Sequence, residues 1–175
     1  MANRLKIDSS LVIEIGTGDG TSAWEFAQRP GAIVQTFEPS TAMRGKAYER
    51  LRDLENVTLM PYAIGGDDRQ AMLHYCNGAA ASLHRAGGER EGCTVVSMNH
   101  WMVYARIGEV DLLFLDCNGS EYEILEQMIE CDRLRQVRRL IIAWDRNDAE
   151  RQAKICDVLA QTHELTDGAW ALIER

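Results

Sequence analysis

The sequence contains no long apolar run, and its first residues include no apolar segment of the kind found in secretory signal peptides. It also contains no C-x-x-C pair. Its five cysteines are odd in number and widely spaced, which argues against a zinc site and against a disulfide framework. These absences predict a cytoplasmic chain with reduced thiols, no membrane-spanning segment and no bound metal.

Positive charge is also scarce. The chain has 19 basic and 27 acidic residues, a net charge of −8, which argues against nucleic acid as a partner because nucleic-acid binding requires a basic face. The densest basic cluster consists of Arg133, Arg135, Arg138 and Arg139, and we interpret it as a solvated helix end and loop. The sequence has no repeats, linkers or low-complexity tract, so its 175 residues are expected to form a single domain, 1–175.

The most informative stretch is 11–20, which reads L-V-I-E-I-G-T-G-D-G. A short β-branched run ends in an acid, and glycines at alternate positions and a helix-compatible segment follow it. Glycine permits a tight turn and lets the backbone approach a ligand closely, and the first N–H groups of a helix lack partners. This order is typical of the nucleotide-binding end of a doubly wound sheet. It predicts that Gly16→Val removes ligand binding and leaves the protein folded.

The next predicted strand, 32–37, ends at Glu38 and Pro39. Glu38 lies 18 positions beyond Gly20, close to where Rossmann-type folds place the acid that binds the ribose hydroxyls. A carboxylate suits a vicinal diol because its two oxygens can accept two hydroxyl protons. We therefore predict that Glu38 binds a ribose, although a solvated acid in a loop would give the same pattern.

Nicotinamide dinucleotides and S-adenosylmethionine share this geometry, and three features separate them. The dinucleotide fingerprint needs glycine at the position of Thr21. Glu14 and Asp19 would repel a pyrophosphate but attract a sulfonium and an ammonium group. No basic residue lies in or beside the turn. The sequence therefore favours S-adenosylmethionine, and a nicotinamide oxidoreductase ranks last.

Strand and helix patterns alternate along the rest of the chain, which predicts an α/β fold with a mostly parallel central sheet and helices on both faces. The most apolar run, 110–116, is expected to be a central buried strand, and 77–92 a mobile loop. His163 is expected in a late loop and the tryptophans in the core. Further strands are predicted at 57–61, 71–75, 93–96, 137–144 and 169–173, and helices around 43–54, 125–129 and 149–161.

Several stretches keep the order and spacing of one family over about 11–145: V-I-E-I-G-T-G-D-G, T-F-E-P, Y-A-I-G-G-D-D, A-S-L and L-F-L-D-C-N-G-S-E-Y-E-I-L. On these stretches the chain resembles the FkbM-like class I S-adenosylmethionine-dependent methyltransferases, which implies their Rossmann-like fold. The last stretch is the most diagnostic, because the family motif resembles L-K-I-D-V-E-G-x-E. Asp116, Gly119 and Glu121 match that motif. The chain departs from it at Phe114, Cys117 and Asn118.

The resemblance implies roles for individual residues. It implies that ten residues bind the cofactor, between them contacting its methionine part, ribose, adenine and sulfonium. These residues are Glu14, Gly16, Thr17, Gly18, Gly20, Glu38, Pro39, Tyr62, Ala63 and Asp116. A hydroxyl acceptor also benefits from a base that takes its proton. Asp116 and Glu121 are the catalytic candidates, with His84 and His100 behind them. Asn118 and Glu121 also form N-x-x-E, a capping-box pattern that could exist for helix stability alone.

The expected activity is O-methylation of a hydroxyl on a small molecule or sugar. One alternative is metal-assisted, catechol-type O-methylation, in which Asp116, Asp145 and Asn147 would supply oxygen ligands to Mg²⁺. Another is a non-catalytic module that keeps the cofactor-binding fold, which the departures at Phe114, Cys117 and Asn118 suggest. The sequence gives no indication of the oligomeric state.

Overall fold

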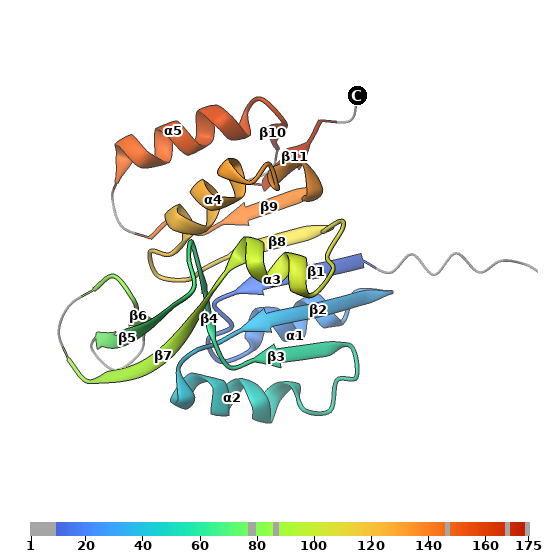
Figure 1. Ribbon diagram of the computed structural model, residues 1–175. Coiled ribbons are helices and arrows are strands. Elements are labelled where there is room, and N and C mark those ends of the chain that lie inside the picture. The colour runs from blue at the N-terminus through green and yellow to red at the C-terminus, as the bar shows by residue number, and fades with distance from the viewer. Residues whose placement is uncertain (1–9, 77–79, 86–87, 146–147, 167–168, 174–175) are drawn as a thin grey trace, which may run out of the picture.

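The central sheet follows the predicted α/β pattern. A computed structural model describes residues 10–76, 80–85, 88–145, 148–166 and 169–173 (Figure 1). Within these residues, seven strands form a sheet in the order β10-β11-β9-β8-β1-β2-β3. All neighbours pair in parallel except β11, which runs antiparallel to β9 and β10. The strands are β1 (Ser10–Ile15), β2 (Ala32–Phe37), β3 (Val57–Met60), β8 (Leu112–Leu115), β9 (Arg139–Ile142), β10 (His163–Thr166) and β11 (Ala169–Leu172).

Helices cover both faces of this sheet because successive strand residues point to opposite sides. In β1, Val12 packs in a cluster with α1 (Thr21–Ala27) and α2 (Thr41–Leu51). Ile13 and Ile15 pack in a second cluster with α3 (Met98–Tyr104), α4 (Glu121–Glu130) and α5 (Ala149–Leu159). The prediction of a mostly parallel sheet with helices on both faces is confirmed.

Strand β8 is the central, buried strand that the sequence predicts. Leu112, Leu113 and Leu115 are buried, and β8 pairs with β1 on one side and β9 on the other. Phe114, which stands where the family motif has lysine, packs edge-on against Phe26 of α1 with ring centroids 5.6 Å apart. The phenylalanine at this position therefore extends the apolar core, and Asp116 still follows the end of the strand as it does in the family motif.

A second sheet lies across the edge at which the parallel strands end (Figure 1). Within the described residues its order is β4-β7-β5-β6, where β5 and β7 are longer than predicted. The expectation of a loop over 77–92 is wrong in part, because a short strand and the start of β7 fall within it, while 77–79 and 86–87 lie outside the described residues. The strands are β4 (Ala63–Gly65), β5 (Arg69–Cys76), β6 (Ala80–Ser82) and β7 (Arg90–Ser97).

Some local expectations need correction. His163 lies in strand β10 and is buried, with Nε2 2.9 Å from the carbonyl oxygen of Val137, so it ties β10 to the segment that leads into β9. Trp24 is 44% exposed on α1 and does not belong to the core, because it faces away from the sheet. Helix α3 and strands β4, β6 and β10 were not predicted, since they are short and carry weak periodicity.

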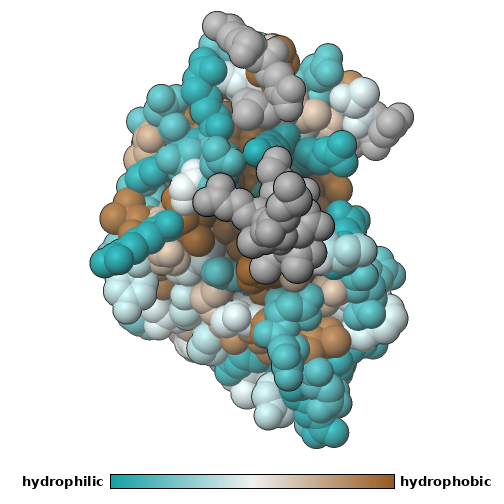
Figure 2. Space-filling model, turned by 90° about the vertical axis from the view of Figure 1, so that its right-hand side faces the viewer, coloured by the Kyte–Doolittle hydropathy of each residue, from teal (hydrophilic) through white to brown (hydrophobic). Residues whose placement is uncertain are grey.

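The basic cluster is largely solvated, as predicted. Arg135, Arg138 and Arg139 are exposed, whereas Arg133 is half-buried and donates to the Asn99 side chain. Figure 2 views the side of the molecule where the parallel strands begin, and hydrophilic side chains cover much of this face with apolar areas between them. None of the helices in the described part of the chain has the length and apolar character needed to cross a bilayer.

Candidate active site

Two adjoining cavities among the described residues lie where β1, β2 and β8 end. One is small, about 40 Å³, and we call it the enclosed cavity because it is the more closed of the two; the other is an open groove of about 320 Å³. They share Gly16, Glu38, Ala81 and Asn118, so they form one continuous site. The enclosed cavity is lined largely by apolar side chains, and the groove by the glycine-rich turn and by acids. This position is the usual ligand site of parallel α/β sheets.

The glycine-rich turn joins two distant parts of the chain. Gly16 has a φ of +95°, and a Cβ there would lie 2.0 Å from the carbonyl oxygen of Asp116. Glycine is therefore required at position 16 mainly because the backbone after β1 passes very close to the backbone after β8. Gly18 also has positive φ (+57°), but no described atom lies within 4 Å of its would-be Cβ. Since Gly18 lines the groove and has no side chain, the space beside it stays free for a ligand.

Glu38 lies at the junction of the two cavities. Its Oε2 accepts from the Gly18 N–H at 2.8 Å and its Oε1 from the Ser40 N–H at 2.9 Å. Each carboxylate oxygen has a second lone pair for a ligand. Burial raises the pKa of Glu38, while its hydrogen bonds to the Ser40 and Gly18 N–H groups lower it. The structure therefore places Glu38 where a ribose diol could meet both of its oxygens.

Glu14 lies behind the turn and not in the cavities. It shares the α1 face of β1 with Val12, because the strand alternates, and its carboxylate accepts from the hydroxyls of Ser22 and Thr36. The side chain is fully buried, and the described residues that line the two cavities do not include it. Direct contact of Glu14 with a methionine group, as the resemblance implied, does not follow from this geometry. Its carboxylate instead supports the turn.

The carboxyl of Glu14 should make folding stability depend on pH. Burial raises its pKa to about 7 from 4.5, against the lowering effect of the bonds to Ser22 and Thr36. The folded state therefore keeps a proton that the unfolded state has lost, and stability falls as pH rises from about 4.5 through 7. Over that pH range we expect the free energy of unfolding to fall by about 3 kcal/mol more in wild type than in Glu14→Gln. Urea unfolding of both proteins at pH 5 and pH 8 measures it.

The difference between the two proteins isolates Glu14, because all other titrating groups are common to both. Glutamine keeps the volume and can still bond both hydroxyls. If the free energy of unfolding changes with pH by the same amount in wild type and Glu14→Gln, the pKa of Glu14 is not raised in the folded protein and the prediction is wrong.

Asp116 ends β8 and lines the open groove. Its backbone N–H donates to the carbonyl oxygen of Ile15, so the residue is held against the end of β1. Burial and then the neighbouring Asp145 carboxylate raise the pKa of Asp116. Asp145 is itself paired with Arg85, whose Nη2 lies 2.6 Å from each carboxylate oxygen. Asp116 is thus a groove-facing acid with a stronger affinity for a proton than an ordinary aspartate.

Glu121 holds the turn that follows Asp116. It is fully buried, and its two oxygens accept from the backbone N–H groups of Cys117 at 2.7 Å and Gly119 at 2.8 Å. The described cavity-lining residues do not include Glu121. The geometry is not that of a capping box either, because Ser120 occupies the cap position and Asn118 bonds elsewhere. Glu121 fixes the backbone after β8, and its role as a catalytic base stays a prediction.

The two residues expected beside the adenine, Tyr62 and Ala63, differ in position. Ala63 lines the enclosed cavity, as does Pro39. Tyr62 does not belong to the lining of either cavity: its hydroxyl donates to the Met60 sulfur at 3.0 Å, and its ring lies 5.5 Å from the Phe37 ring. In this structure the ring packs against Phe37, and the placement of Tyr62 beside the adenine stays a prediction.

The remaining residues of the turn differ in position. Thr17 lines the groove, and its hydroxyl bonds the Thr36 hydroxyl behind it. Gly20 belongs to neither cavity lining; its close neighbour is Ala47, so it allows α1 to start against α2. Leu73, Ala81 and Leu83 from the second sheet complete the enclosed cavity, and only the A-S-L stretch hinted at them in the sequence.

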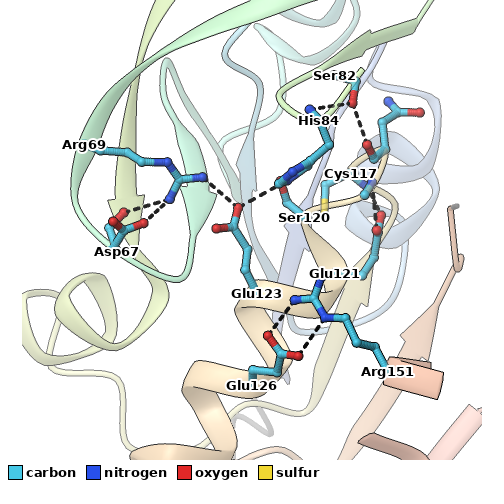
Figure 3. A network of polar contacts seen from close by, with 12 residues as sticks. Asp67, Arg69, Ser82, His84, Cys117, Ser120, Glu121, Glu123, Glu126 and Arg151 are labelled. Carbon is cyan, nitrogen blue, oxygen red and sulfur yellow. Dashed lines mark hydrogen bonds and ion pairs between the residues drawn. The ribbon is translucent and has the colours of Figure 1, made fainter. Parts of the chain in front are cut away.

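A polar network lies beside the site (Figure 3). Nε2 of His84 is 3.0 Å from the Ser120 hydroxyl and 3.4 Å from Glu123, and Glu123 also binds Arg69 at 2.9 Å. Burial alone would raise the pKa of Glu123, but its bonds to His84 and Arg69 lower it to about 2. His84 is thus engaged in this network. His100 is exposed and binds Asp68, the residue before β5, away from the groove lining.

The metal-assisted alternative would use Asp116, Asp145 and Asn147. Asp145 is already paired with Arg85, and Asn147 lies outside the described residues. Within the described part of the chain, no group of three His, Cys, Asp or Glu side chains is placed to hold a metal ion. A metal at Asp145 would have to displace the Arg85 guanidinium.

Comparison with known proteins identifies the family. The model of the Methyltransferase FkbM domain matches residues 14–167. Comparison with curated proteins gives no match. Among solved structures, an rRNA methylase from Streptococcus thermophilus is similar at 15% identity and a TM-score of 0.53, over 95% of this chain and 89% of that chain.

Two further structures share the fold. A fibrillarin/Nop5p complex is similar at 13% identity and a TM-score of 0.52, over 95% of this chain and 68% of that chain. The human methyltransferase 10 domain containing protein is similar at 13% identity and a TM-score of 0.50, over 99% and 76%. The match to the family model covers most of the chain. The chain therefore belongs to the FkbM methyltransferase domain family and is an S-adenosylmethionine-dependent methyltransferase.

Proposed function

We propose that this chain methylates a hydroxyl oxygen of a small molecule or sugar, that Asp116 takes the hydroxyl proton, and that residues 1–175 act as one methyltransferase domain. The observation that carries the proposal is the place of Asp116. Its carboxylate lines the open groove, next to the glycine-rich turn, and burial and Asp145 raise its pKa. A base with a raised pKa takes a proton more readily in the transition state.

The residues of the groove fit S-adenosylmethionine. Among the described residues that line it are Asp19, Glu38 and Asp116, and none of those lining residues is Lys or Arg. This acidic groove complements a sulfonium and an ammonium group. The wall of the enclosed cavity is largely apolar and includes Pro39 and Ala63, which suits contact with an aromatic ring. We therefore place the methionine part in the groove, the ribose at Glu38 and the adenine in the cavity.

When bound, the cofactor supplies an electrophilic methyl group on positively charged sulfur. The chain has to hold an acceptor oxygen in line with that methyl group, which lowers the entropy cost of the reaction. Asp116 accepts the proton that the hydroxyl loses while the oxygen gains the methyl group. Glu121 contributes indirectly, because its bonds to Cys117 and Gly119 fix the backbone next to Asp116.

The test is a screen for methyl transfer to hydroxylated small molecules and sugars, read by mass spectrometry. Each compound is paired with its deoxy analogue, which lacks the hydroxyl. Transfer to the hydroxyl compound alone supports the proposal. Transfer to nitrogen or carbon would refute it, and cofactor binding without any transfer would favour the non-catalytic alternative. Loss of activity with a chelator and rescue by Mg²⁺ would favour the metal-assisted one.

The ribose assignment gives a direct prediction. Glu38→Ala should weaken binding of S-adenosylhomocysteine by about 1–3 kcal/mol, the range for losing hydrogen bonds to a charged group. Titration calorimetry measures the affinity. Glu49→Ala, which removes an exposed acid on α2, is the matched control and should leave the affinity unchanged. Equal affinity in Glu38→Ala and wild type would remove Glu38 from the ribose site.

A further inference from the structure

The enclosed cavity is too small for the group that the proposed function places in it. Its volume is about 40 Å³. A protein cavity that holds one benzene ring has a volume of about 150 Å³, and the two fused rings of adenine are larger than benzene. The wall of the cavity must therefore move before adenine can enter.

One wall of this cavity is formed by a narrow strip of chain. Ala81 in β6 and Leu83 just after it both line the cavity. Ser82 lies between them in the chain, and because side chains of a strand alternate, it points to the other side; the chain then bends at Leu83 and His84. Among the described strands, β6 pairs only with β5. Residues 81–85, which we call the roof, are thus attached to their own sheet along one edge.

The free edge of the roof is bonded to the turn after β8. The Ser82 hydroxyl donates to the carbonyl oxygen of Asn118 at 2.7 Å, and the Asn118 side-chain amide donates to the carbonyl oxygen of Ala81 at 3.1 Å. Asn118 has a φ of 55°, a conformation that asparagine adopts more easily than most residues. Asn118, one of the departures from the family motif, therefore both shapes the turn and holds the roof.

Two more contacts hold the far part of the roof. The His84 ring lies 3.0 Å from the Ser120 hydroxyl, and Figure 3 shows Ser82 and His84 on the same side of the roof, toward the turn that precedes α4. Arg85 binds Asp145 at the end of β9. Ala81 and Leu83 thus cover the cavity, whereas Ser82, His84 and Arg85 bond residues that follow β8 and β9.

We propose that residues 81–85 are a closed roof over the adenine, that Asn118 and Ser82 hold it shut before the cofactor binds, and that it must lift for the cofactor to enter and leave. This inference rests on the placement of adenine in the enclosed cavity. Ser82 is a positioning residue, since it acts through the roof, whereas Asn118 both holds the roof and lines the two cavities. They set how fast the cofactor exchanges more than how tightly it binds.

The test measures both rate constants for S-adenosylhomocysteine by surface plasmon resonance. Ser82→Ala removes the bond to Asn118, and Asn118→Gly removes the bond to Ala81 while keeping a residue that accepts the positive φ. Each lost bond should make opening roughly fivefold more frequent, because a hydrogen bond contributes about 1 kcal/mol. We expect association and dissociation to accelerate by the same factor, with the dissociation constant within about threefold of wild type.

Gln70→Ala is the matched control, because Gln70 bonds Thr94 on the exposed face of the same sheet and has no contact with the roof. Its rates should equal those of wild type. Unchanged rates in both roof variants would overturn the inference, and so would faster dissociation with unchanged association, which indicates lost ligand contacts instead of a gate. No acceptor is present in these measurements. If the rate constants contradict the roof, the hydroxyl-acceptor proposal is unaffected. If the acceptor screen gives no methyl transfer, the rate constants still test the roof.

Discussion

Replacing Asp116 by asparagine should lower turnover by about 10²–10⁴-fold, the usual contribution of a general base. Asparagine keeps the volume of the side chain, and the contact with Gly16 involves only the backbone of Asp116, so the fold should be preserved. Affinity for S-adenosylhomocysteine should change little, because that product lacks the positive sulfur. Turnover is measured with the acceptor found in the screen, and affinity by calorimetry.

The acidic limb of the pH–rate profile provides an independent measurement. Because burial and Asp145 raise the pKa of Asp116, activity in wild type should rise with pH at values above those of an ordinary aspartate. Asp53→Asn, an exposed acid after α2, is the matched control and should retain full turnover. If Asp116→Asn is nearly as active as wild type, the base lies elsewhere and His84 is examined next. A parallel collapse of cofactor affinity would assign Asp116 to binding.

Replacing Gly16 by alanine should destabilise the whole fold by about 3–5 kcal/mol. The new Cβ would lie 2.0 Å from the carbonyl oxygen and 2.8 Å from the carbonyl carbon of Asp116, and the φ of +95° is unfavourable for any residue with a Cβ. Backbone atoms cannot rotate away as a side chain can. This geometry contradicts the expectation that Gly16→Val leaves a folded protein. Urea unfolding of Gly16→Ala and wild type measures the loss.

The neighbouring glycine gives the matched control for this substitution. In Gly18→Ala the Cβ meets no described atom within 4 Å, so only the positive φ has a cost, about 1–2 kcal/mol. Both variants alter the same turn. Equal losses in the two would mean that the contact with Asp116 is relaxed in solution and that backbone conformation alone determines the requirement for glycine.

Periodicity and the strand-end rule predicted from the sequence where several residues of the candidate site lie. Strand β2 begins and ends where its apolar run predicts, and Glu38 follows it into the site. Asp116 likewise follows the most apolar run into the groove. These predictions succeed because parallel strands, buried on both faces, have a clear apolar pattern and end at a common edge.

The direction of a side chain at a strand end depends on tertiary packing, which the pattern does not contain. Glu14 and Glu121 both lie at the predicted edge, yet Ser22, Thr36 and two backbone N–H groups take their oxygens away from the cavities. Tyr62 is taken up by the core in the same way. The roof was not predictable either, because its bonds to Asn118 connect segments 36 and 37 positions apart.

The pairing of β1 with β8 has a consequence for folding. The Leu11 N–H bonds Asp111, 100 positions away, whereas Glu14 meets Thr36 of β2 across only 22 positions. Closing the longer loop costs about 1.3 kcal/mol more chain entropy, and contacts distant in sequence form slowly. The two halves of the proposed methyl-donor site follow these two strands. During synthesis on the ribosome, a nascent chain that lacks β8 has the glycine-rich turn without its partner, so we expect cofactor binding to begin only after that strand has emerged and docked.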